Sequence, residues 1–79
     1  MAGASEIWQN RAKGILRVEI ARRDISHREL IERLAEMGIK ESESGLSNKL
    51  ARGSFSAAFM LAVLNAIGVK TVRVAQEDD

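Results

Sequence analysis

The sequence predicts a small all-helical domain of four or five helices. Three observations point to this fold class: the chain has only 79 residues, it contains no proline, and glycines at 38, 53 and 68 follow apolar runs at nearly even intervals. A chain of this length builds one hydrophobic core. A proline-free sequence rich in alanine, leucine, glutamate and arginine favours helix, and glycine is typical of a helix C-terminus. We therefore expect one domain over residues 5–74, between an unstructured start at 1–4 and an acidic unstructured tail at 75–79.

The first helix is expected from Glu6 to Arg23, with Ser5 as its N-cap. Apolar side chains recur along it at helical spacing and predict an inward face. That face comprises Trp8, Ala12, Ile15, Leu16 and Ile20.

The second helix begins at the clearest boundary in the chain, after Ser26. Serine followed three residues later by Glu29 is a capping box, in which the hydroxyl caps the third amide and the glutamate reaches back to the serine. Glu29 also forms an i,i+4 pair with Arg33. Ile25 is placed to pack on Leu30 or its neighbour Ile31 as a hydrophobic staple. The predicted buried stripe of this helix comprises Leu30, Ile31, Leu34 and Met37.

The third helix is short and polar, from Glu43 to Arg52 after the N-cap Ser42. Only Leu46 and Leu50, at i and i+4, are expected to hold it to the core. Its outward residues are therefore small and polar.

The fourth helix is expected from Ala57 to Ile67 after the N-cap Ser56, with Phe55 and Met60 as its hydrophobic staple. It is apolar nearly all round, so a domain of this size leaves part of it exposed. With Phe59, Val63 and Ile67 in the core, we expect Leu61, and Leu64 or Met60, to face outward. Residues 69–74 alternate β-branched side chains, which predicts either a short strand or a frayed extension.

Composition excludes several classes of function. The chain has no cysteine and a single histidine, so we expect neither a metal site nor a cofactor, and no nucleophile with an adjacent base indicates an enzyme. No apolar run is long enough to cross a bilayer and no signal peptide is evident. We expect a cytoplasmic protein. Apart from the acids at 77–79, the chain has 12 basic and 8 acidic residues, a net charge of +4 that permits phosphate binding.

A capped helix, a connection containing Gly38 and a short second helix together have the layout of a helix-turn-helix. Residues 25–69 resemble the lambda repressor and Cro class of such domains, also called XRE-type. The matching motifs are Ile25-Ser26, Glu29-Leu30, Leu34-Ala35, Met37-Gly38-Ile39, Ser44-Gly45-Leu46, Arg52-Gly53, Ser56 and Leu64 to Val69. A second set resembles a family of small bacterial proteins described as a domain of unknown function. That set is Trp8, Leu16-Arg17, Asn48-Lys49, Arg52-Gly53 and Phe55 to Phe59.

The first resemblance implies sequence-specific binding of double-stranded DNA by a transcription regulator associated with the bacterial nucleoid, with Glu43 to Arg52 as the recognition helix. The connection from Leu34 to Leu46 is longer than this class usually has, so the register of that helix stays open by one residue. The residues expected to contact bases are Ser44, Ser47, Asn48 and Glu43, of which Glu43 fits a structural role at the helix N-terminus equally well. The residues expected to contact phosphates are His27, Arg28, Lys49, Arg52 and Arg17, each of which also fits a solvated surface position.

The apolar fourth helix predicts a homodimer, since paired half-sites increase the affinity of this class. The expected interface residues are Met60, Leu61, Leu64, Val72 and Val74. The alternative is a protein-interaction module on the same fold, such as an antitoxin or a phage-type modulator, that uses this helix to hold a protein partner.

Overall fold

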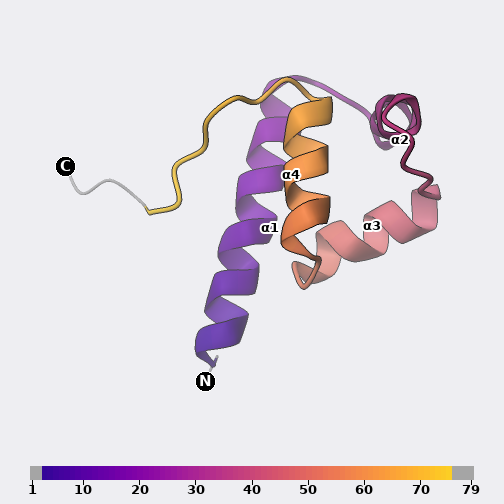
Figure 1. Ribbon diagram of the computed structural model, residues 1–79. Helices are drawn as coiled ribbons and strands as arrows, with labels where there is room; N and C mark the ends of the chain where they lie inside the picture. The colour runs from indigo at the N-terminus through magenta and orange to yellow at the C-terminus, as the bar shows by residue number, and fades with distance from the viewer. Residues whose placement is uncertain (1–2, 76–79) are drawn as a thin grey trace.

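The computed structural model describes residues 3–75 and has four helices (Figure 1). They are α1 (Ala4–Arg22), α2 (His27–Glu36), α3 (Glu43–Arg52) and α4 (Ala57–Ala66). The all-helical prediction is confirmed, and residues 3–75 contain no strand: the segment after α4 is irregular. α1 starts earlier than predicted, with Gly3 rather than Ser5 as its N-cap, so residue 4 is helical. Residues 1–2 and 76–79 of the predicted unstructured ends lie outside the described residues.

Serine side chains define the N-termini of the other three helices, as predicted. The hydroxyls of Ser26, Ser42 and Ser56 each accept a hydrogen bond from the third amide of the following helix, at 3.1, 3.0 and 3.0 Å. Each bond satisfies one of the backbone donors that a helix start leaves unpaired. The second half of the predicted capping box is not formed, because the Glu29 carboxylate accepts from Arg33 instead, at 2.7 Å.

Three of the helices end in the same way, with one residue in the left-handed conformation followed by an aliphatic residue. Gly38 and Gly68 have φ of 84° and 85° after α2 and α4, and Asp24 has φ of 53° after α1. The amides of the next residues, Ile39 and Val69, donate back to the carbonyls of Leu34 and Leu64 at 2.9 Å. This Schellman pattern returns the chain to the core at each helix end.

The core forms where α1 and α2 each pack on both α3 and α4. Its buried members are all aliphatic: Leu16, Ile20, Ile25, Leu30, Leu34, Leu46, Leu50, Val63, Leu64 and Ile67. Two residues that the sequence predicted to be buried are exposed instead. Trp8 is 57% exposed, because the first turns of α1 project beyond the other helices (Figure 1), and Met37 at the end of α2 is also exposed. No helix within residues 3–75 is long and apolar enough to cross a membrane.

Gly53, the left-handed C-cap of α3, packs against the backbone of α1. A Cβ at this position would collide with the Gln9 carbonyl oxygen and lie 3.0 Å from its carbon and 3.1 Å from the Lys13 Cβ. The Lys13 ammonium donates to the Ala51 carbonyl at 3.1 Å, next to this contact. Glycine is therefore required here both by its φ of 73° and by the lack of space.

We predict that Gly53→Ala destabilises the protein by about 3 kcal/mol, since left-handed backbone strain and overpacking each cost about 1–2 kcal/mol. Gly38→Ala is the matched control: it has the same backbone strain, but its Cβ would meet no atom within 4 Å. It should cost only about 1 kcal/mol. Urea unfolding followed by circular dichroism measures both values, and equal losses would show that the contact with α1 adds nothing.

Candidate functional site

The outward face of α3 is the polar surface that the sequence predicted. Leu46 and Leu50 are buried beneath the helix. Helical spacing places Ser44 and Asn48 opposite these leucines and Ser47 on one flank. All four predicted base-contacting residues are exposed: Glu43, Ser44, Ser47 and Asn48. The burial of these two leucines therefore determines which face of α3 is exposed.

Ser47 lies beside the first residue of α2. The His27 Nδ1 atom is 3.2 Å from the Ser47 Oγ atom, and both side chains are exposed. A residue expected to contact phosphate and one expected to contact a base are therefore joined by a hydrogen bond. Sequence spacing gave no sign of this pair, since its members are 20 residues apart on different helices.

Lys49 has structural partners that the sequence did not indicate. Its ammonium donates to the Glu41 carboxylate at 2.9 Å and lies 4.9 Å from the centre of the Phe59 ring. The ion pair joins the last turn of α3 to the connection before the helix, and the cation–π contact joins that turn to α4. Lys49 stays a predicted phosphate contact, but such a contact would first have to break this arrangement.

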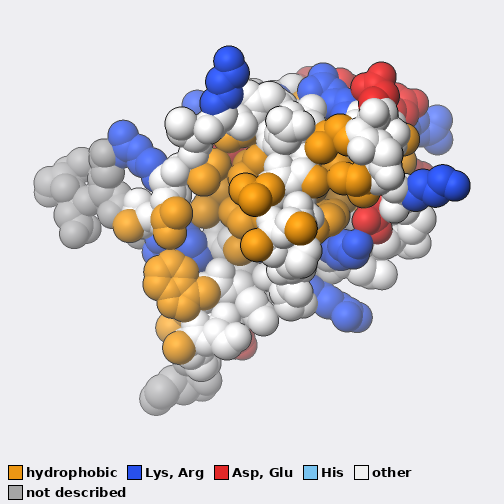
Figure 2. All heavy atoms as spheres, viewed as in Figure 1, with side chains coloured by type: hydrophobic (Ala, Val, Ile, Leu, Met, Phe, Trp, Pro, Cys, Tyr) orange, Lys and Arg blue, Asp and Glu red, His pale blue; other side chains and the backbone are white. Residues whose placement is uncertain are grey.

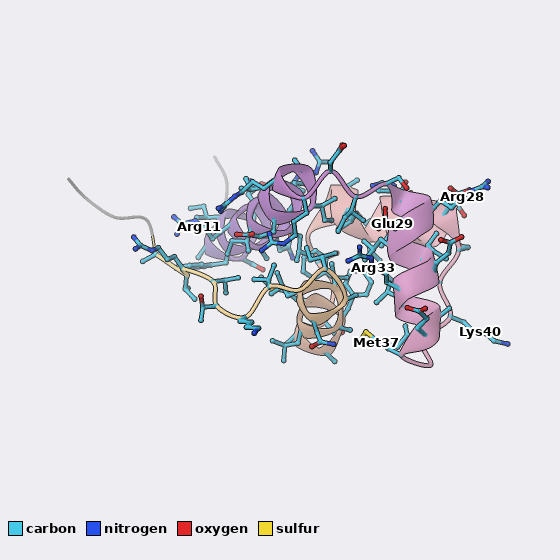
Figure 3. All side chains as sticks on the ribbon, turned by 90° about the horizontal axis from the view of Figure 1, so that it is seen from above. Arg11, Arg28, Glu29, Arg33, Met37 and Lys40 are labelled. Atoms are coloured by element: carbon cyan, nitrogen blue, oxygen red, sulfur yellow. The ribbon has the colours of Figure 1, made fainter. Side chains whose placement is uncertain are left out.

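Arg28 points away from the bundle on the outer side of α2 (Figure 3). Arg52 is exposed at the end of α3, and Arg17 lies one turn after Lys13 on the edge of α1 that meets α3. Lys40, which the sequence reasoning missed, points outward from the connection between α2 and α3 (Figure 3). Within residues 3–75 no hydrogen bond or ion pair occupies these four cations.

The remaining arginines of α1 and α2 are engaged within the fold. Arg33 pairs with Glu29, as predicted, and also donates to the Ala66 carbonyl at the end of α4, at 3.2 Å (Figure 3). Arg22 and Arg23 both pair with Glu19. They are therefore poorer candidates for phosphate binding than the four outward cations.

The predicted dimer residues do not all face outward. Leu64 is 5% exposed and belongs to the core, so its expected outward position is corrected: the turn after α4 folds back over it. Met60 and Val72 are half-buried, whereas Leu61 is 67% exposed and Val74 is also exposed. Figure 2 shows apolar side chains over α4 and separately over the N-terminal part of α1.

The family model described as Domain of unknown function (DUF6471) matches residues 8–72. The chain belongs to this family. The match covers all of α2, α3 and α4, most of α1, and the segment after α4 as far as Val72. A search of curated proteins and a search of solved structures found no match.

The cap of α3 determines where the polar face begins, and we predict that Ser42→Ala destabilises the protein by about 1 kcal/mol. The hydroxyl that accepts from the Gly45 amide would be lost. Ser54→Ala is the control, because Ser54 is exposed and lies outside the helices; its effect should stay within about 0.5 kcal/mol. Thermal unfolding measures both, and an equal effect of the two substitutions would contradict the capping role.

Proposed function

We propose that this domain binds double-stranded DNA sequence-specifically, as a small transcription regulator, with α3 as its recognition helix. The observation that supports this is the outward face of α3, where Ser44, Ser47 and Asn48 are short, polar and exposed over a helix held from below by two leucines. The major groove, roughly 12 Å wide, admits a helix whose side chains are short enough for close approach. A carboxamide such as that of Asn48 can bond adenine bidentately.

The cations around α3 suit a supporting role at the phosphates. Arg28 and the first residue of α2, His27, lie at a helix N-terminus, where the backbone dipole favours an anion. Arg17, Lys40 and Arg52 would reach the DNA backbone on either side of the groove. These contacts position the protein on the duplex, while α3 reads the bases.

The resemblance to the lambda repressor and Cro class adds weight to the same proposal. In that class the first helix of the motif crosses the DNA backbone and the second enters the major groove. Here α2 and α3 pack on each other, and six residues separate Glu36 from Glu43. This connection is longer than usual for the class, but both ends of α3 are fixed by their own caps.

Asn48→Ala should lose roughly 1–3 kcal/mol of binding free energy on the preferred DNA sequence alone. Arg28→Ala should weaken binding to all sequences about equally and reduce the salt slope by about 1. For the unaltered chain, log affinity should fall with log salt with a slope of about −4, as expected for about four phosphates. Fluorescence anisotropy with DNA selected from pooled genomic fragments measures all three.

Asn10→Ala is the matched control for Asn48→Ala, because Asn10 is exposed on the part of α1 that faces the C-terminal segment rather than α3. It should leave binding unchanged. If the pool yields no bound fragment even at low salt, the DNA-binding proposal is wrong and the protein-interaction alternative gains support.

We further propose that two copies bind together through the exposed surface of α4. Leu61→Glu should then convert a dimer to a monomer, because it places a charge in an apolar contact. Val18→Glu is the control, since Val18 is an exposed apolar residue on α1. Sedimentation velocity measures the mass of each variant. Dissociation by Val18→Glu but not by Leu61→Glu would place the contact between copies on α1.

A further inference from the structure

We infer that the protonation state of His27 determines which bases Ser47 selects. This inference rests on the proposed function and deepens it. The observation that carries it is the 3.2 Å contact between the His27 Nδ1 atom and the Ser47 Oγ atom, at the junction of the two helices proposed to bind DNA. Both side chains are exposed, so each is free to contact DNA while retaining the other as a partner.

The chemistry of imidazole makes the direction of this hydrogen bond depend on pH. In the neutral ring one nitrogen carries a proton and the other accepts. If the Nε2–H group donates to a DNA phosphate, Nδ1 must be the acceptor, and the Ser47 hydroxyl donates its only proton to it. The Ser47 oxygen then offers only lone pairs to the groove. Those lone pairs suit a donor on a base edge, the N4 amino group of cytosine or the N6 amino group of adenine.

In the protonated ring both nitrogens donate. The Nδ1–H group then donates to the Ser47 oxygen. The Ser47 hydroxyl no longer donates to His27, so its proton is available to another acceptor. That proton suits an acceptor on a base edge, such as O6 or N7 of guanine or O4 of thymine. Ser47 therefore prefers a hydrogen-bond donor on the base when His27 is neutral and an acceptor when His27 is protonated. The contact between His27 and phosphate is kept in both states.

The charged side chains near the pair come from α2 and α3. The titratable residues of α3 are Glu43, one turn before Ser47, Lys49, which is paired with Glu41, and Arg52. On α2 Arg28 and Glu29 follow His27 in the first turn, whereas α4, which also packs on α2, carries no titratable side chain. Of these side-chain types, only histidine ordinarily changes its charge between pH 5 and 8.

The experiment is a selection of bound duplexes from a randomised pool at pH 5.5 and at pH 8.0, with the full chain. The chain should select a different base at one position at the two pH values, with a change of about threefold to tenfold in relative affinity, the effect of one hydrogen bond. Ser47→Ala should remove this change, and so should His27→Gln, because glutamine can still contact phosphate but does not titrate in this range.

The outcomes separate this inference from the function on which it rests. If no duplex is selected at either pH, the proposed DNA binding itself fails. If duplexes are selected with the same preferred bases at both pH values, DNA binding stands and the role of His27 is overturned. If the pH-dependent change persists in Ser47→Ala, or in His27→Gln, the hydrogen-bonded pair is not its cause.

Discussion

The orientation of α3 depends on the close approach between Gly53 and the backbone of α1. Because no side chain fits between them, the end of α3 is held at a fixed distance from Gln9. Lys13 adds a hydrogen bond to the Ala51 carbonyl at the same end, where a cation is favoured by the helix dipole. Lys49, in the last turn of α3, also bonds Glu41 in the connection before the helix. With its last turn held against α1 and with Leu46 and Leu50 buried beneath it, α3 turns its polar face outward.

Much of this fold can be predicted from local signals in the sequence. Four helices, three serine caps and the left-handed glycines follow from residue types and spacing, because each signal acts within one helical turn. The end of α1 was placed one residue late because its left-handed residue is Asp24, and a non-glycine residue with positive φ is uncommon. Trp8 was misplaced for another reason: helical spacing identifies an apolar stripe but not how far along the helix its partners extend.

The site was less predictable than the fold. The polar face of α3 follows from two leucines four residues apart, so the sequence could identify it. The partners of Ser47 and Lys49 could not be identified, because they depend on how separate helices pack. His27 precedes Ser47 by 20 residues, and Phe59 lies on a different helix from Lys49. Spacing along one helix predicts the face on which a side chain lies. Which cations form ion pairs depends on how the separate helices pack.

That pairing bears on how such a domain would bind DNA. Glu19, Glu29 and Glu41 occupy four of the basic side chains, and Figure 2 shows acidic groups gathered where Figure 1 places α2. The 12 basic residues counted from the sequence therefore overstate the positive charge available to phosphate. With about four outward cations per copy, the electrostatic part of the proposed DNA affinity would be modest and strongly salt-dependent. Two copies on adjacent half-sites, spaced about 34 Å apart, would double it.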